Sequence, residues 1–215
     1  HSAFFGHHFL ALFAQALDAQ GHDIARLEPT RLGLAPHADT GGRVVLSIFN
    51  CKKPVIGAIN GAAVGIGATM TLPMDIRIAS EKARIGFVFG KIGVVPEACS
   101  TWFLPRIVGM GHAMDIILSG ERVDADHALR IGLVNRVYPA DQLLARTLDY
   151  AQMLASRSPL SHRFAKEVMR RSVGMPLDEA LRLESRSFYD VGLTEDLAEG
   201  TTSFREKRAA NFKGR

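Results

Sequence analysis

Hydrophobic and polar positions follow different periods along this chain, and those periods predict both strands and helices. Residues 55–59 form a short apolar run between chain-breaking residues, which is typical of a buried strand. Residues 75–79 alternate polar and apolar side chains, so a half-buried strand is predicted there. Residues 83–89 and 133–137 indicate two further extended segments.

Helical patterns occur toward both ends of the chain. Residues 7–19 carry apolar side chains at helical spacing, and residues 43–50 are expected to form a second short helix. The stretch 20–42 between them is rich in glycine and proline and predicts a long loop. From Asp141 onward the chain is expected to be almost wholly helical.

Two residues indicate where helices begin. Pro96 suits the first turn of a helix running through Trp102, because an N–H group is not needed there. Asp124 is a candidate N-cap. Because strands and helices alternate early and helices accumulate late, we predict an α/β fold. Its core is expected over residues 1–140, with a helical region over 141–215 in the same functional unit.

Composition and charge narrow the function classes. The 215 residues are 47% hydrophobic and 22% charged, which is ordinary for a globular protein and excludes disorder as the main state. The net charge of +4 resides in residues 201–215, which hold five basic side chains and one acidic side chain. A nucleic-acid-binding protein more often carries a basic stripe along a folded face, so no nucleic-acid partner is expected.

The location of the protein is predicted from weaker signals. Two cysteines are too few for a disulfide scaffold, and no secretory signal is visible, so a cytoplasmic location is expected, with a removed targeting segment as the alternative. Residues 54–74 carry no charge and are long enough to span a bilayer. The prolines, the asparagine and the glycines within them argue against a membrane helix, and no membrane span is predicted.

The glycine-spaced segment 61–67 is a candidate site because it lies between a predicted strand and a predicted helix over 68–72. Glycines allow a ligand to approach the main chain, and a helix N-terminus offers free N–H groups to negative charge. The spacing matches neither the dinucleotide motif nor the phosphate loop. Close packing of strand against helix is the alternative explanation.

Several segments, in order, resemble the signature of the crotonase superfamily, the enoyl-CoA hydratases and isomerases. The similar segments are residues 53–67, Asp75–Ala79, Gly93–Glu97, Gly120–Ala125 and Glu199–Phe212. The resemblance covers roughly residues 43–215. It implies a crotonase-like spiral of ββα units with a helical C-terminal trimerisation region, and a homotrimer or dimer of trimers.

The resemblance also implies an enzyme that acts on an acyl-CoA thioester, with coenzyme A as part of the substrate and no other cofactor. Family members hold the thioester oxygen between two backbone N–H groups as an enolate forms. One donor here would be the N–H of Ile66. The other is placed near Gly6, in a stretch that departs from the family's usual turn.

The residues that would move protons differ from those of hydratases in the family. Hydratases carry two glutamates, and the matching positions here are Thr69 and Phe89. Glu97, after Pro96, matches the glutamate base of one branch of the Δ3,Δ2-enoyl-CoA isomerases. An acid that merely favours a helix N-terminus is the alternative role for Glu97.

Three functions therefore stay open. The first is an enoyl-CoA isomerase with Glu97 as its base. The second is an enoyl-CoA hydratase or a thioester hydrolase in which Glu97 and Thr69 hold water. The third is an acyl-CoA-binding subunit without catalytic activity.

Other side chains are assigned by the same resemblance. The expected substrate pocket is lined by Thr69, Phe87, Phe89, Val95 and Trp102. Core packing is the alternative for the aromatic members of this set. Lys207 is expected to reach the phosphates of coenzyme A, with solvent exposure as the alternative. No metal site is predicted, because the histidines lack partners at suitable spacing.

Overall fold

The structure is a computed structural model that describes residues 40–215. These residues form two compact units. The first comprises residues 40–51 and 55–147, and the second comprises residues 52–54 and 148–215.

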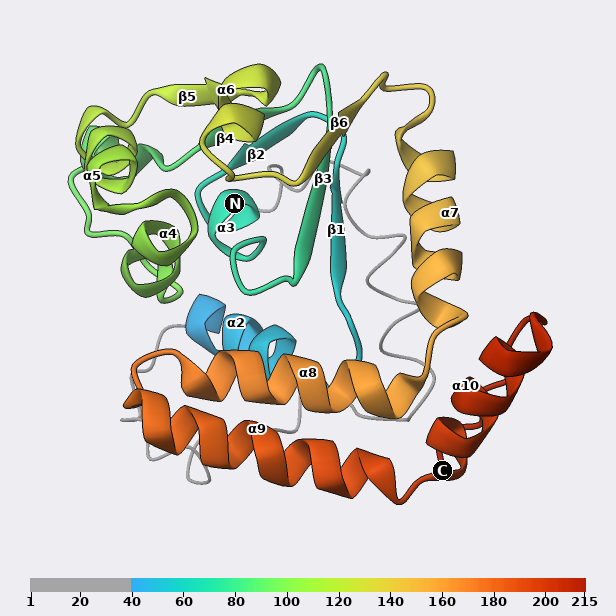
Figure 1. Ribbon diagram of the computed structural model, residues 1–215. Helices are drawn as coiled ribbons and strands as arrows, with labels where there is room; N and C mark the ends of the chain where they lie inside the picture. Colours follow the sequence, from blue (N-terminus) through green and yellow to red (C-terminus); the bar gives the residue numbers. More distant parts are fainter. Residues whose placement is uncertain (1–39) are drawn as a thin grey trace. The chain divides into compact units, whose positions relative to one another are not determined.

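The first unit contains a parallel sheet in the strand order β1-β3-β6. Its strands are β1 (Ile56–Ile59), β3 (Ile76–Ser80) and β6 (Arg136–Tyr138), which run side by side in Figure 1. In the register of β1 and β3, Ile59 lies opposite Ala79. Parallel pairing agrees with the apolar composition of β1 and with the burial of most of β3, since strands of such sheets are usually covered on both faces.

A second sheet of three strands lies in the same unit, in the order β2-β4-β5. Strand β2 (Ala62–Val64) pairs parallel with β4 (Arg84–Gly86), and β4 pairs antiparallel with β5 (Arg122–Asp124). Strand β2 lies within the glycine-spaced segment 61–67, which was not predicted to contain a strand. Its three residues are the apolar ones that separate Gly61 from Gly65.

Short helices precede, separate or follow the strands of the first unit and contribute side chains to its core. They are α2 (Thr40–Asn50), α3 (Ile66–Thr69), the 3-10 helix η3 (Val88–Ile92), α4 (Ser100–Val108), α5 (Met110–Ser119) and α6 (Ala125–Arg130). As predicted, Asp124 caps α6, because its Oδ1 accepts the N–H of His127 at 2.8 Å. The helix expected at 43–50 is confirmed, although it begins at Thr40 within the predicted loop.

The core of the first unit is a single large apolar cluster that reaches from β1 to α6. Its fully buried members include Ile59, Ile85, Phe87, Leu104 and Val134. Ile59 and Ile85 come from the two sheets and Leu104 comes from α4, so the two sheets and the short helices share one core.

The predicted half-buried character of residues 75–79 is wrong at Arg77, whose side chain is buried on β3. Its Nε donates to the carbonyl of Leu133 at 2.7 Å. Its Nη1 donates to the carbonyls of Met74 at 2.7 Å and Leu72 at 3.3 Å. Burial lowers the pKa of Arg77 to about 10, so the guanidinium stays charged at neutral pH.

The second unit is helical, as the pattern after Asp141 predicted. Helix α7 (Leu143–Ala155) crosses the boundary between the units and is followed by α8 (Pro159–Ser172), α9 (Leu177–Gly192) and α10 (Glu195–Glu206). Helices α8 and α9 lie side by side (Figure 1). None of the helices in the described part of the chain is long and apolar enough to cross a membrane.

Candidate active site

The glycine segment places the start of α3 at the end of β2. The N–H of Gly65 donates to the carbonyl of Gly86 at 3.0 Å, which extends the pairing of β2 with β4 by one residue. Gly65 has φ of +58° and ψ of −125°, a conformation that a residue with a Cβ atom rarely adopts. The chain therefore turns sharply at Gly65, and α3 begins at the next residue.

Ile66 is the first residue of α3 and is half-buried. N–H groups in the first turn of a helix have no acceptor within that helix. The N–H groups of Ala68 and Thr69 turn back to the carbonyl of Gly65, at 2.9 and 3.0 Å. The N–H of Ile66 thus has the chemistry that the predicted oxyanion donor requires. The predicted second donor, Gly6, lies outside the described residues.

Thr69 and Glu97 come together although they are 28 positions apart in the sequence. The Oγ1 atom of Thr69 donates to Oε1 of Glu97 at 3.1 Å. Thr69 is fully buried at the end of α3, whereas Glu97 is half-buried. Thr69 and Glu97, for which the resemblance implies proton-transfer or water-binding roles, therefore form one hydrogen-bonded pair.

Glu97 stands in the connection between η3 and α4, on an unusual stretch of backbone. Ala98 and Cys99 have φ of +54° and +55°, in the left-handed region that residues other than glycine rarely occupy. The carbonyl of Glu97 accepts hydrogen bonds from Ser100 N at 3.0 Å and from Ser100 Oγ at 2.7 Å. Strained backbone of this kind is common at functional sites.

This backbone corrects one sequence prediction. The helix expected to start at Pro96 starts instead at Ser100, because the left-handed residues Ala98 and Cys99 cannot belong to a right-handed helix. Glu97 therefore does not lie in the first helical turn. This weakens the alternative in which it only satisfies a helix dipole.

The remaining predicted pocket residues fall into two groups. Phe87 and Phe89 are buried in the core cluster of the first unit. Val95 is 78% exposed and Trp102 is 41% exposed. The Trp102 ring packs edge-on against Phe49 and Phe103 and carries the guanidinium of Arg106 at 4.1 Å from its centre.

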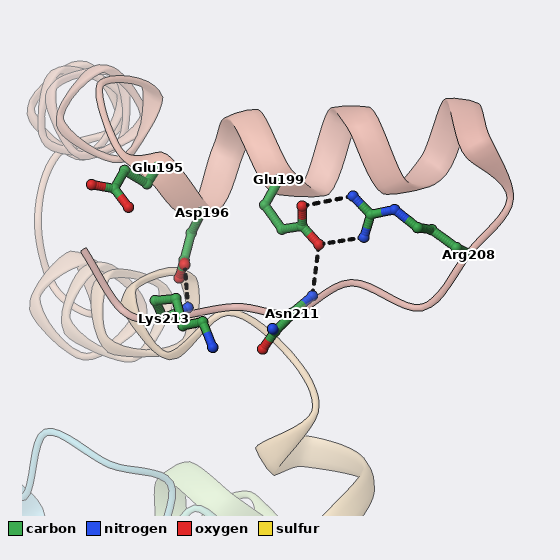
Figure 2. A pocket seen from close by; sticks show the side chains of 6 residues that line it. All are labelled: Glu195, Asp196, Glu199, Arg208, Asn211 and Lys213. Carbon is green, nitrogen blue, oxygen red and sulfur yellow. Dashed lines mark hydrogen bonds and ion pairs between the residues drawn. The ribbon is translucent and has the colours of Figure 1, made fainter.

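Lys207 belongs to the second unit, where it ends α10 in a left-handed conformation and is exposed. The chain after it runs back along α10, held by acidic side chains (Figure 2). Glu199 accepts from Nη1 and Nη2 of Arg208 at 2.6 and 2.8 Å and from Asn211 N at 2.7 Å. The hydrogen bonds from Arg208 are the main cause that lowers the pKa of Glu199 to about 2.

Asp196 holds the end of the same tail and is buried. Its Oδ1 accepts the N–H of Lys213 at 2.7 Å and its Oδ2 accepts the hydroxyl of Ser158 at 2.8 Å. Burial alone would raise the pKa of Asp196, but these bonds and that from Gly214 N–H outweigh burial and lower the pKa. These contacts of Asp196 and Glu199 were not predicted, because acids at positions 196 and 199 on a helix resemble an ordinary solvated face.

A metal centre is not indicated. Residues 40–215 contain no group of three or more histidine, cysteine, aspartate or glutamate side chains arranged to hold a metal ion. Cys51 and Cys99 are both free thiols.

Comparison with known proteins identifies the family. Residues 21–215 match the family described as "Enoyl-CoA hydratase/isomerase". The chain is 42% identical over 179 residues to the enoyl-CoA hydratase ACTT3 of Alternaria alternata, an alignment that covers 82% of this chain and 60% of that protein. It is 38% identical to the short-chain-enoyl-CoA hydratase of Clostridium acetobutylicum, covering 81% of this chain and 67% of that protein.

Solved structures agree with the sequence relatives. The crystal structure of an enoyl-CoA hydratase from Bacillus anthracis superposes with a TM-score of 0.79 at 31% identity, covering 89% of this chain and 73% of that chain. The chain spans about 60% of the length of the Alternaria relatives. It has the α/β crotonase fold, and it belongs to the enoyl-CoA hydratase/isomerase family.

Proposed function

We propose that the protein acts on acyl-CoA thioesters and shifts the double bond of a 3-enoyl-CoA into conjugation, with Glu97 as the base. One observation carries the proposal. The two glutamate positions of the family's hydratases hold Thr69 and Phe89, and the carboxylate beside Thr69 comes from Glu97 instead. A single carboxylate suffices for an allylic shift, because the proton that it removes is the proton that it returns.

The chemistry follows from these positions. Glu97 takes a proton from the α-carbon, and the electron pair of the broken C–H bond moves into the thioester to give a dienolate. The N–H of Ile66 binds the enolate oxygen, a contribution of about 3–4 kcal/mol for a well-placed donor. The protonated Glu97 then gives its proton to the γ-carbon, which leaves the conjugated 2-enoyl thioester and the original carboxylate.

Binding and assembly are proposed from the family resemblance. Val95 and Trp102, which expose apolar surface in the unit that holds Glu97, are favoured over the buried Phe87 and Phe89 as walls of the acyl pocket. Lys207, at the exposed end of α10, is proposed to contact a phosphate of coenzyme A. Assembly as a trimer, or as a dimer of trimers, is proposed for the helical C-terminal unit.

Hydration of a 2-enoyl-CoA is the second candidate. Relatives that are 42% and 38% identical are named enoyl-CoA hydratases. The hydrogen-bonded pair of Thr69 and Glu97 also has the donor and acceptor groups that could hold a water molecule. In that reaction the same carboxylate would have to deliver both parts of water, whereas the family's hydratases use two.

Glu97→Gln tests the proposal. The amide keeps the size of the side chain but cannot accept a proton from carbon, so kcat for conversion of 3-enoyl-CoA to 2-enoyl-CoA should fall by about 10²–10⁴. KM should change little, since a base acts mainly in the transition state. The absorbance of the conjugated thioester follows the reaction.

Glu81→Gln is a matched control, because Glu81 is an exposed glutamate in the turn after β3 of the same unit. It should keep the parent activity. If the parent protein converts 3-enoyl-CoA and Glu97→Gln retains more than a tenth of kcat, Glu97 is not the base. Net addition of water to 2-enoyl-CoA without any conversion of the 3-enoyl isomer would favour the hydratase.

A further inference from the structure

We infer that Thr69 is a positioning residue for Glu97, whose hydroxyl holds the carboxylate in the orientation from which it takes a proton from carbon and returns it. The inference rests on the proposed function and adds a second residue to it.

Thr69 and Glu97 are joined by a direct hydrogen bond. A buried hydroxyl requires a partner, and Thr69 Oγ1 has two acceptors within reach but one proton to donate. The carbonyl of Ile66 lies at 3.3 Å and Oε1 of Glu97 at 3.1 Å. Because an ionised carboxylate is the stronger acceptor and also the nearer one, the proton of Thr69 points to Glu97.

Thr71 shows what a buried threonine does here without a carboxylate. It is also almost fully buried, two residues further along, and its Oγ1 donates to the carbonyl of Ala68 at 2.7 Å. Both threonines thus face the carbonyl three residues before them. The hydroxyl of Thr71 lies close to its local carbonyl. The hydroxyl of Thr69 lies further from its own local carbonyl and donates to Glu97 instead.

The side chains of Thr69 and Glu97 differ in conformational freedom. Thr69 is β-branched and buried, so its χ1 torsion is restricted and the fold fixes its hydroxyl. Glu97 is longer, half-buried and carried by a loop. Ser100 fixes the backbone end of Glu97 through two hydrogen bonds to its carbonyl. The hydroxyl of Thr69 fixes the carboxylate end, and the side chain is held at both ends.

This arrangement has a consequence for the fate of the proton. After Glu97 takes the α-proton, it must present that proton to the γ-carbon before the proton exchanges with water. A carboxylate held in one orientation favours transfer along the substrate, because the reacting groups are already aligned. A carboxylate that turns freely gives more exchange for each isomerisation.

The experiment therefore compares two fates of the proton on Glu97, which are exchange with solvent and transfer to the γ-carbon. In D₂O, NMR measures deuterium incorporation into the recovered 3-enoyl-CoA and its conversion to 2-enoyl-CoA in the same sample. Thr69→Val keeps the shape of the side chain and removes the hydroxyl. We expect it to lower kcat about tenfold, to leave KM nearly unchanged, and to raise the ratio of exchange to isomerisation severalfold. Thr69→Ser, which restores a hydroxyl, should restore that ratio.

Thr71→Val is the matched control, since it removes an equally buried hydroxyl that bonds only to the backbone. It should leave the ratio of exchange to isomerisation at the parent value, whatever it does to stability. A ratio that is unchanged in Thr69→Val, or that rises equally in Thr71→Val, would overturn the inference. The proposed function fails separately, if the parent protein neither exchanges the α-proton nor isomerises the substrate.

Discussion

Arg77→Met is expected to destabilise the first unit more than an arginine-to-methionine substitution at an exposed position does. Methionine fills much of the space that arginine leaves, but it cannot donate to the carbonyls of Leu72, Met74 and Leu133. Each buried acceptor that loses its partner costs about 1–3 kcal/mol. Loss of the two bonds of 2.7 Å lowers the free energy of unfolding by about 2–6 kcal/mol, and removal of a buried charge offsets part of this loss. The expected net loss is about 3 kcal/mol.

Urea unfolding followed by the fluorescence of Trp102, the single tryptophan of the sequence, measures this loss in the N-terminal unit. Arg84→Met is the matched control, because Arg84 is exposed and its Nη1 donates to local carbonyls of Glu81 at 3.4 Å and Ala83 at 2.8 Å. It should cost less than about 1 kcal/mol. Equal losses of unfolding free energy in Arg77→Met and Arg84→Met, measured at the same protein concentration, would refute this prediction.

Two further expectations concern backbone strain and the C-terminal tail. Cys99→Gly removes a left-handed conformation that costs about 1–2 kcal/mol with a Cβ atom, against about 0.5–1 kcal/mol of added chain entropy. The free energy of unfolding should rise by up to about 1 kcal/mol in the same titration, whereas Cys99→Ala should gain nothing. The pKa of Glu199 is about 2 in the folded state, below its usual value, so its hold on Arg208 and Asn211 is complete above pH 4.5 and is lost as pH falls toward 2. The amide resonance of Asn211 should move with that titration, and Glu199→Gln should abolish the movement.

Local sequence patterns predicted the parts of the fold that depend on local forces. The apolar run at β1 and the helical periodicity after Asp141 gave elements that the structure confirms. The N-cap at Asp124 was predictable because a cap requires only residues within three positions of one another. These elements are determined by side-chain period and by short-range hydrogen bonds, which a single sequence displays.

Features that depend on distant partners could not be predicted in this way. Arg77 alternates with apolar neighbours as an exposed residue would, and its burial depends on carbonyls as far away as Leu133. The start of α4 was misplaced because nothing in Ala98 or Cys99 as residue types indicates a left-handed backbone. In each case the deciding interaction lies between segments that the chain brings together only on folding.

The candidate site combines both kinds of information. Family resemblance identified Ile66, Thr69 and Glu97 separately, and the proposed oxyanion donor at Ile66 is a backbone group, which isoleucine supplies as glycine does. The contact between Thr69 and Glu97 needed the structure, since 28 residues separate them. The structure thus shows that Thr69 and Glu97 contact each other, which the sequence alone did not indicate.

That contact also relates the threonine at position 69 to the glutamate at position 97. A glutamate at position 69 would place a second carboxylate within hydrogen-bonding distance of Glu97, where Thr69 Oγ1 now lies at 3.1 Å from Oε1. Two carboxylates at such a separation repel each other, and each raises the pKa of the other, so one of them would ionise less readily. A threonine at this position donates a hydrogen bond to Glu97 and adds no negative charge beside it, which suits the proposed role of Glu97 as the base. On this backbone an ionised Glu97 therefore favours threonine over glutamate at position 69, and the proposed one-carboxylate reaction uses Glu97 where the family's hydratases would use positions 69 and 89.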